Sequence, residues 1–209
     1  MNAIFFDLDG TLTDPFEGIS RCILYALEQL DEPAPSHDDM LSFIGPPLQV
    51  TFRSLVGESR AGEALDLYRE RFFDIGWQEN EAYDGIHDAL ETVGERGAAM
   101  YVATTKPWVA AEKIVDHFGM GEFFERVFGS ELDGTRIDKT ELLAYAVEQE
   151  SLSGPGVMIG DRHHDIIGGL NNNLATIGVS YGYGSTEELR TAGAGAIAAR
   201  PADIPALLG

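Results

Sequence analysis

The chain has 209 residues, and its 35 acidic residues against 14 basic ones give a formal net charge of −21. With 44% hydrophobic residues, it can bury the core of one ordinary domain and of a smaller accessory unit. The acidic surplus disfavours nucleic-acid backbones and anionic membranes as partners, and a phosphate site in such a chain must supply its own positive charge.

The amino-terminal residues MNAIFFDLDG lack the basic stretch and the longer apolar run of a signal peptide. No later segment approaches the ~18 consecutive apolar residues of a membrane span. We therefore expect a cytoplasmic protein with neither a membrane nor a nucleic acid as its partner. Cys22 is the single cysteine, so no internal disulfide can form. The sequence leaves the oligomeric state open.

Short apolar runs, each followed by a polar or glycine-containing turn, predict the strands of a parallel sheet. Their ranges are 3–6, 98–103, 156–159 and 174–179, with 126–128 as a weaker fifth candidate. Helical patterns such as 110–118 and 141–148 lie between them, so the alternation predicts an α/β fold with an open, doubly wound sheet. Toward the carboxyl end, Ser185 with Glu188 indicates a capping box on the last helix, and residues 192–199 form only an alanine- and glycine-rich tract.

One connection is too long for this pattern, because about seventy residues follow the first strand where α/β loops usually take ~2–6. Asp14, Pro15 and Glu17 predict an N-cap, a proline at the first helical position and a capping-box partner for a helix ending near residue 30. Ser36 and Asp39 predict a second helix start in the same manner. We expect residues 15–81 to form an inserted helical cap, and residues 1–14 and 82–209 to form the catalytic core.

Polar residues follow the predicted strands where these end, and open parallel sheets bind ligands at the carboxyl ends of their strands. The residues expected at this edge are Asp7, Asp9, Thr104, Thr105, Lys106, Lys139, Asp161 and Asp165. Lys139 belongs to the set because a helix predicted to begin at Asp138, with Glu141 as its capping-box partner, presents this lysine in its first turn.

Carboxylates at this density repel one another unless a hard cation lies among them. Mg²⁺ suits a few carboxylates, a backbone carbonyl, water and substrate phosphate. Lysine, threonine and the backbone amides at helix starts suit phosphate oxygens. The residue types therefore indicate a magnesium site next to a phosphate site.

Four motifs, spread over nearly the whole chain, resemble those of the haloacid dehalogenase superfamily. They are DLDGTLTD at 7–14, VATTKP at 102–107, Lys139, and GDRHHD at 160–165. Each alone is weak, because short aspartate-containing strings are common in an acidic chain, but four in order at strand ends are specific. Within the superfamily, the chain resembles the phosphoglycolate-phosphatase-like branch with a small helical cap. The resemblance implies a Rossmann-like core and a phosphoric monoester hydrolase that acts on a small phosphate ester.

The resemblance also implies roles for the acidic residues. Asp7 would attack phosphorus and become aspartyl phosphate, while Asp9 would protonate the leaving oxygen and then deprotonate the hydrolytic water. Mg²⁺ would bind Asp7, the backbone carbonyl of Asp9 and Asp161. Asp165 would support this site, with the alternative that it merely caps the following helix.

By the same resemblance, Thr104, Thr105 and Lys139 would hold the phosphoryl group. Lys106 contacts either phosphate or only solvent. Arg136, in the turn before the catalytic lysine, is a candidate for substrate contact or for balancing local acids.

In the cap, Gly45 and Pro46 begin a stiff loop that resembles the family's specificity loop, and Arg53 follows one turn later. The alternative is a rigid connection between cap helices. His163 and His164 are adjacent, and adjacent residues in a turn seldom point at one ion. We expect them to be loop residues with an electrostatic role.

Two other functions fit parts of this pattern. A sugar-phosphate mutase would use the same aspartyl phosphate and return the phosphoryl group to the substrate. A signalling receiver domain also gathers acids, a threonine and a lysine around an aspartate, but it lacks both a cap and an acid such as Asp9 beside the nucleophile. The substrate itself stays open, and the VATTKP and DGTR strings resemble 5′-nucleotidases more than phosphoglycolate phosphatases.

Overall fold

The computed structural model describes residues 3–152 and 154–208. The chain divides into two compact units, of which the first contains residues 3–13 and 82–208 and the second contains Asp14–Glu81. The chain passes between them at two short strands that pair with each other, β2 (Thr13–Asp14) and β3 (Glu81–Ala82). Each unit is described separately below.

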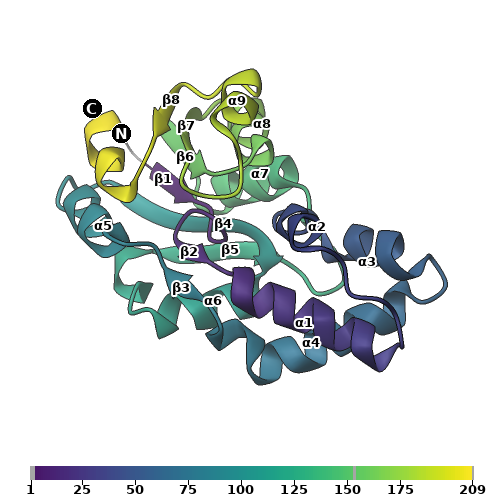
Figure 1. Ribbon diagram of the computed structural model, residues 1–209. Coiled ribbons are helices and arrows are strands. Elements are labelled where there is room, and N and C mark those ends of the chain that lie inside the picture. The colour runs from purple at the N-terminus through teal and green to yellow at the C-terminus, as the bar shows by residue number, and fades with distance from the viewer. Residues whose placement is uncertain (1–2, 153, 209) are drawn as a thin grey trace. The chain divides into compact units, whose positions relative to one another are not determined.

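The described residues of the first unit form a six-stranded sheet in the order β5-β4-β1-β6-β7-β8 (Figure 1). These strands are β5 (Arg126–Ser130), β4 (Ala99–Pro107), β1 (Ala3–Phe6), β6 (Gly156–Gly160), β7 (Ala175–Val179) and β8 (Ala196–Ala198). All neighbouring strands are parallel. The order runs outward from β1 in both directions, as in doubly wound folds, so the predicted α/β fold class is confirmed.

The sequence predicted five strands, and the structure has a sixth. β8 (Ala196–Ala198) pairs in parallel with β7, and its first residue, Ala196, lies opposite Ile177. It falls within the tract that the sequence indicated only as alanine- and glycine-rich. A three-residue edge strand with two alanines carries almost none of the β-branched or aromatic pattern by which strands are recognised.

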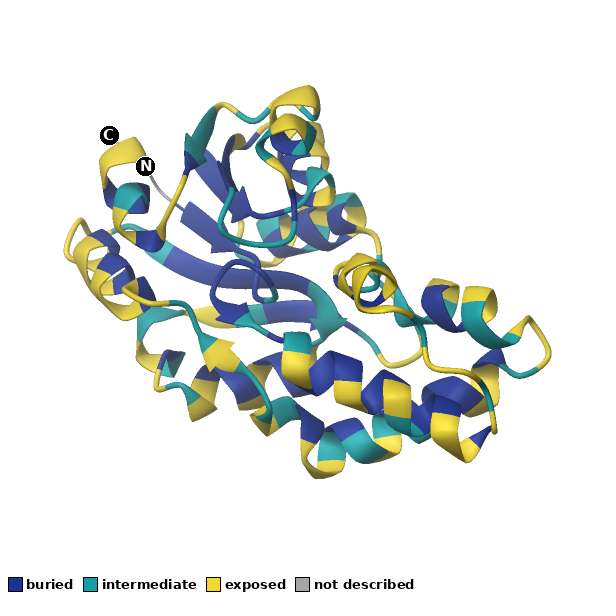
Figure 2. Ribbon diagram, viewed as in Figure 1, coloured by how far each residue is buried: buried dark blue, intermediate teal, exposed yellow. Residues whose placement is uncertain are grey.

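The central strand β1 is buried on both faces, which is usual for a parallel sheet covered by helices on each side. On one face, Phe5 stacks on Tyr101 with ring centroids 5.3 Å apart. On the other face, Phe6 meets Phe124 edge-on at 5.9 Å. Figure 2 shows the inner strands in the dark blue of buried residues. Because neither face of β1 is open to water, polar chemistry is confined to the ends of the strand.

Helices of the first unit lie on both sides of the sheet, with α7 and α8 on one side and α5 and α6 on the other (Figure 1). The described helices and 3₁₀ turns of this unit are α5 (Ile86–Gly94), α6 (Trp108–His117), η2 (Gly121–Phe123), α7 (Lys139–Gln149), α8 (His163–Asn171), α9 (Thr186–Thr191), η3 (Pro201–Asp203) and α10 (Ile204–Leu207). Asp138 caps α7, since its carboxylate accepts from the amides of Thr140 and Glu141. The cap fixes Lys139 as the first residue of α7.

The second unit is helical and contains α1 (Phe16–Gln29), α2 (His37–Ser42), α3 (Leu48–Val56), α4 (Ala61–Asp74) and the turn η1 (Gly76–Gln78). Within it, α4 packs against α1 and α3. The capping box of Ser36 with Asp39 is present as predicted. The predicted capping box of Asp14 with Glu17 is wrong. Pro15 occupies the N-cap position, and Asp14 instead accepts from the Phe16 amide at 3.0 Å, as in an Asx turn.

An ionic cluster joins α1, α4 and the segment after η1 within the second unit. The guanidinium of Arg71 binds both carboxylate oxygens of Glu79, at 2.6 and 3.0 Å. Arg21 donates to the same carboxylate at 2.8 Å, and Arg71 also donates to the buried Cys22 sulfur at 3.2 Å. Cys22 is therefore a structural thiol held by the cluster.

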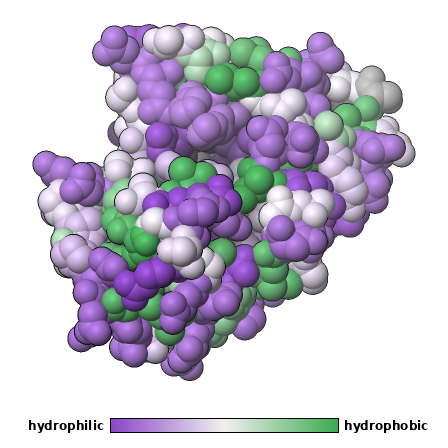
Figure 3. Space-filling view, turned by 90° about the vertical axis from the view of Figure 1, so that its right-hand side faces the viewer, coloured by the Kyte–Doolittle hydropathy of each residue, from purple (hydrophilic) through white to green (hydrophobic). Residues whose placement is uncertain are grey.

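The surface view in Figure 3 is dominated by hydrophilic residues, with hydrophobic ones in smaller separate areas. This agrees with the acidic composition of the chain. Among the residues that the structure describes, no helix is both long enough and apolar enough to cross a membrane.

Candidate active site

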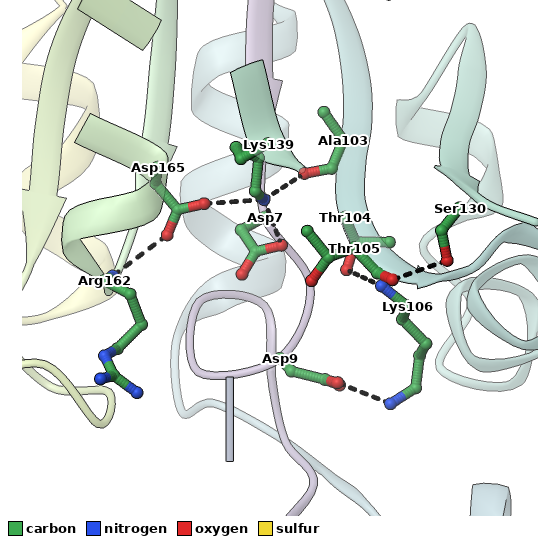
Figure 4. A network of polar contacts seen from close by, with 10 residues as sticks. All are labelled: Asp7, Asp9, Ala103, Thr104, Thr105, Lys106, Ser130, Lys139, Arg162 and Asp165. Atoms are coloured by element: carbon green, nitrogen blue, oxygen red, sulfur yellow. Dashed lines mark hydrogen bonds and ion pairs between the residues drawn. The ribbon is translucent and has the colours of Figure 1, made fainter. Parts of the chain in front are cut away.

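Asp7 stands at the carboxyl end of β1, where its amide still bonds to the Ile159 carbonyl at 2.9 Å. Its carboxylate oxygen Oδ1 accepts from Lys139 Nζ at 2.8 Å. The same ammonium donates to the Ala103 carbonyl at 2.8 Å and lies 2.7 Å from Asp165 Oδ1 (Figure 4). Lys139 thus connects Asp7, at the carboxyl end of β1, with Ala103 of β4 and with Asp165 in the first turn of α8.

The Lys139 side chain is 4% exposed, so its charge depends on its partners. Burial by itself would lower the pKa of this ammonium, but the charges of Asp165 and Asp7 outweigh burial and raise the pKa above its usual value. Lys139 therefore stays positive throughout the physiological range.

Three buried carboxylates, of Asp7, Asp161 and Asp165, lie with one oxygen each within 4.8 Å of one another. Burial raises the pKa of Asp161 well above its usual value, and the charges of Asp165 and Asp7 add to the effect. Burial likewise raises the pKa of Asp165 to about 6, although Lys139 opposes it. Fully ionised, three carboxylates and the Lys139 ammonium sum to a charge of −2, which one divalent cation would neutralise.

Asp9, two residues after Asp7, faces a different partner. Its Oδ2 accepts from Lys106 Nζ at 2.5 Å, and the two side chains are only 15% and 8% exposed. Burial raises the pKa of Asp9 despite the opposing effect of Lys106. Lys106, for which the sequence left phosphate or solvent as alternatives, thus contacts a candidate catalytic acid.

Near its carboxyl end, β4 has an irregular register with β5 between Thr104 and Pro107. Thr104 is buried, and its hydroxyl accepts from the Lys106 amide at 3.2 Å. The Thr105 carbonyl accepts from the Ser130 hydroxyl at 2.7 Å. Figure 4 shows Thr104 and Thr105 between the Asp7–Lys139 pair and the Asp9–Lys106 pair. The predicted phosphate-binding residues are therefore gathered with the acids at one sheet edge.

A family model described as haloacid dehalogenase-like hydrolase matches residues 4–179. The chain belongs to this family. The hydrolase class and the superfamily that the four motifs indicated are confirmed.

Among relatives of this haloacid dehalogenase-like hydrolase, a 5′-nucleotidase of Pseudomonas aeruginosa is 48% identical over 190 residues, which cover 90% of this chain and 86% of the relative. A protein from Mycobacterium tuberculosis named tyrosine-protein kinase PtkA is 38% identical over 88% of this chain, and the match covers 64% of its length. The crystal structure of a predicted phosphatase from Clostridium acetobutylicum has a TM-score of 0.93 at 39% identity, covering 99% of this chain and 97% of that one.

In this hydrolase, Asp165 has two contacts at once. Its Oδ2 accepts from the Arg162 amide at 3.0 Å, which closes the start of α8, while Oδ1 faces Lys139. His163 and His164 lie in the first turn of α8, so their predicted place in a loop is wrong. Capping at the start of α8 and pairing with Lys139 therefore occur together, and neither excludes the other.

The predicted capping box of Ser185 with Glu188 forms only one of its two hydrogen bonds. Ser185 accepts from the Glu188 amide at 3.0 Å. The Glu188 carboxylate turns to α8 instead, where one oxygen accepts from Arg162 Nε at 3.0 Å and from the His163 amide at 2.9 Å, with His163 Nδ1 at 2.7 Å. No local sequence pattern indicates this contact, because it joins His163 to a residue 25 positions away.

The remaining candidates are Arg136 in the first unit and three residues of the second unit. Arg136 pairs with Glu131 and covers the Tyr145 ring at 4.4 Å from its centroid. This agrees with the alternative that it balances local acids. In the second unit, Arg53 pairs with Glu58 at 3.0 Å and is 55% exposed. Gly45 and Pro46 lie in the bend between α2 and α3, where Gly45 has φ = 102°.

Proposed function

We propose that the protein hydrolyses small phosphomonoesters through an aspartyl phosphate on Asp7. The proposal rests on one arrangement: Asp7 is held by a permanently charged Lys139 and flanked by Asp161 and Asp165, with the proton carrier Asp9 two residues away. A raised pKa at Asp9 suits a group that must donate a proton near neutral pH.

The acid cluster fits a divalent cation by its own chemistry. Asp161 Oδ1 is buried and has no hydrogen-bond partner among the described residues. An oxygen in that state costs free energy unless a cation or water satisfies it. Oxygen ligands of this kind favour Mg²⁺, held by Asp7, Asp161 and the Asp9 backbone carbonyl, with Asp165 in support. When bound, Mg²⁺ would offset the negative charge of the transferring phosphoryl group.

In the first half-reaction, an Asp7 carboxylate oxygen attacks phosphorus in line with the bond to the leaving oxygen. The new Asp7–phosphorus bond forms as the phosphorus–oxygen ester bond breaks, and Asp9 gives its proton to the leaving alkoxide. Thr104, Thr105 and Lys139 hold the phosphoryl oxygens. Lys139 suits this role because its ammonium already lies at the end of β1.

In the second half-reaction, water attacks the same phosphorus. Asp9, now ionised, takes one proton from that water as the bond from phosphorus to Asp7 breaks. Inorganic phosphate leaves, the Asp7 carboxylate is restored, and Asp9 carries the proton needed for the next cycle. Lys106, which binds Asp9 at 2.5 Å, would keep this carboxyl group in place between the two steps.

Nucleoside 5′-monophosphates are the first substrate class to test, since the chain is 48% identical to a 5′-nucleotidase. Phosphoglycolate is the second, because of the branch that the motifs resemble. We further propose that residues 15–81 act as a cap, with Gly45, Pro46 and Arg53 selecting the leaving group and with Lys106 or Arg136 contacting it.

The test is phosphate release in a panel of phosphorylated metabolites with Mg²⁺, with Asp7→Asn as the blank. Release from one ester class above the blank supports the proposal. Isomerised sugar phosphate without free phosphate would show a mutase instead, and a phosphoaspartate that persists for hours would show a receiver-like domain. Transfer from ATP to a tyrosine-containing peptide, the activity that the name PtkA suggests, would point to a kinase.

A further inference from the structure

The loop after β7, residues 180–184, reaches back to Asp161 at the end of β6. The amide of Tyr183 donates to Asp161 Oδ2 at 2.8 Å. Neither the four motifs nor the metal ligands proposed above include any residue of this loop. Its contact fixes one of the two oxygens of a carboxylate that is 1% exposed.

Glycines make this approach possible. A Cβ at Gly182 would overlap the Gly10 carbonyl and come within 2.6 Å of Asp161 Cβ. A Cβ at Gly184 would overlap the Asp161 carbonyl oxygen, and one at Gly10 would overlap the Asp161 carboxylate. The turn after β1 and the loop after β7 therefore both approach Asp161 at distances that no other residue type permits.

The loop is tethered at its other positions as well. The Tyr181 hydroxyl donates to the Thr11 carbonyl at 2.9 Å, and its ring meets Tyr83 edge-on at 4.9 Å. At the base of the loop, the Ser180 amide donates to Ala198 at 2.9 Å. These contacts hold the loop to the turn that follows the nucleophile and to the edge strand β8, so the Tyr183 amide has a fixed position relative to Asp7.

With Oδ2 held by Tyr183, the other oxygen of Asp161 has a defined place. Oδ1 is buried, has no hydrogen-bond partner among the described residues, and belongs to the carboxylate that clusters with Asp7 and Asp165. A carboxylate free to rotate would exchange its two oxygens, whereas this one presents a single oxygen. Partners that orient a metal ligand in this way commonly change metal affinity about 10–100-fold when altered.

We propose that residues 180–184 form a positioning element that holds Asp161 Oδ2 and presents Oδ1 to a divalent cation. Tyr183 acts through its backbone amide, Gly182 and Gly184 through their lack of a side chain, and Tyr181 through its bond to the turn at Thr11. The inference rests on the proposed function only in taking Asp161 as a cation ligand.

The experiment measures Mg²⁺ binding to the metal-stripped full chain by calorimetry, without substrate. Gly182→Ala should raise the dissociation constant about 10–100-fold. Tyr181→Phe, which loses only the one neutral hydrogen bond from the loop to the Thr11 carbonyl, should raise the dissociation constant about 2–10-fold. Gly62→Ala is the matched control: Gly62 lies in α4, a Cβ there meets nothing within 4 Å, and binding should not change.

A merely structural role of the loop would lower the melting temperature and leave the dissociation constant of the folded fraction unchanged. That result in Gly182→Ala and in Tyr181→Phe would overturn the proposal, and Tyr181→Phe decides alone if the alanine variant does not fold. Asp161→Asn separates this failure from a larger one. If the unaltered chain binds no Mg²⁺, or Asp161→Asn binds it equally well, the proposed cation site is wrong and the positioning role falls with it.

Discussion

The two units of the molecule treat buried charge in opposite ways. In the helical unit, hydrogen bonds from Arg71 and then Arg21 hold the pKa of the Glu79 carboxyl below its usual value. In the sheet unit, burial raises the pKa of Asp9, Asp161 and Asp165. Nearby lysine ammonium groups only partly oppose this rise at Asp9 and Asp165, and the Tyr183 amide and Arg162 only partly oppose it at Asp161. In the helical unit, the two guanidinium groups neutralise the Glu79 carboxylate. In the sheet unit, the buried carboxylates outnumber the ammonium groups that could neutralise them.

This difference separates charge that serves stability from charge that serves chemistry. A carboxylate with a lowered pKa stabilises the folded state at neutral pH, whereas buried acids with raised pKa values cost free energy and persist at functional sites. Removing an acid should therefore have opposite consequences in the two units. Removal of one of the buried acids with a raised pKa from the sheet unit should lower activity without lowering stability. Removal of Glu79 from the helical unit should lower stability without lowering activity.

The largest effect is expected from Asp7→Asn. The amide keeps the shape of the carboxylate but cannot form an acyl phosphate, so phosphate release should fall by about 10⁴-fold or more. Since the change removes one negative charge from a crowded cluster, the melting temperature should stay equal or rise. Steady-state kinetics and thermal unfolding of the same preparation check both parts, and turnover within a few-fold of the unaltered chain would refute the nucleophile.

Asp9→Asn should cost about 10²–10⁴-fold, with a size that depends on the leaving group. An alkyl phosphate needs a proton on its departing oxygen, whereas a nitrophenyl phosphate leaves as a stable anion. The loss should therefore be much larger for the alkyl ester. Rates for both esters with the unaltered chain and the variant give the comparison, and equal losses would argue against proton transfer by Asp9.

Asp161→Asn and Glu79→Gln compare the units directly. Mg²⁺ at 100 times its dissociation constant should stabilise the unaltered chain by about 2.7 kcal/mol, and Asp161→Asn should abolish this gain without loss of stability in chelator. Glu79→Gln should lower the free energy of unfolding by about 1–2 kcal/mol with or without Mg²⁺. Urea unfolding of the unaltered chain and of both variants, in Mg²⁺ and in EDTA, provides the six values. An equal response of both variants to Mg²⁺ would contradict the distinction.

Much of the sheet unit could be predicted from sequence because its signals are local. Apolar runs marked β1, β4, β6 and β7. The chemical residues lie at or just beyond the carboxyl ends of these strands or in the first turn of a helix, as Lys139 follows Asp138. Parallel strands then bring these positions to one edge. The fold class and the gathering of acids with Lys139 both follow from that rule.

What the sequence did not reveal depends on contacts between distant residues. Glu188 fits a local capping box equally well on paper, and only the packing of α9 near α8 directs its carboxylate to His163. The Tyr183 amide is a backbone group, so no residue type marks its bond to Asp161. The glycines at 182 and 184 were the one available sign, since alternating glycines after a strand indicate a close backbone approach.

Smaller changes are expected from the proposed cap, because it would select substrates while the sheet unit performs the chemistry. Pro47 follows Pro46 and is the N-cap residue of α3. Arg53→Ala, or Pro46→Ala combined with Pro47→Ala, should lower kcat/KM for the preferred metabolite about 10-fold, a loss of ~1.4 kcal/mol in transition-state binding. Turnover of a small aryl phosphate should hardly change. Parallel losses on both substrates would show that these residues serve stability or closure, and not recognition.

The smallest effect is expected from Glu188→Gln. This variant tests whether an acid of the sheet unit that is neutralised by its hydrogen-bond partners contributes to stability as Glu79 does. Although burial opposes it, hydrogen bonds from His163 and Arg162 lower the pKa of Glu188 to about 2. A carboxyl with a depressed pKa contributes stability above its unfolded pKa of about 4.3 and loses it as pH falls toward 2. Because the side chain is 25% exposed, the contribution at pH 7 should be about 1 kcal/mol or less.

The difference in unfolding free energy between the unaltered chain and Glu188→Gln should therefore shrink as the pH falls from 4.5 to about 2. Urea unfolding across this range measures it, with Glu187→Gln on the same helix as the matched control. A difference that grew as the pH fell below 4.5 would reverse the sign and contradict the pairing of Glu188 with Arg162 and His163. A constant difference over the whole range would mean that the contact acts through packing and not through charge. The predicted decline would show that Glu188, like Glu79, is a carboxylate that its partners stabilise in the ionised form. The acids whose pKa values are raised would then be those at the carboxyl end of the sheet.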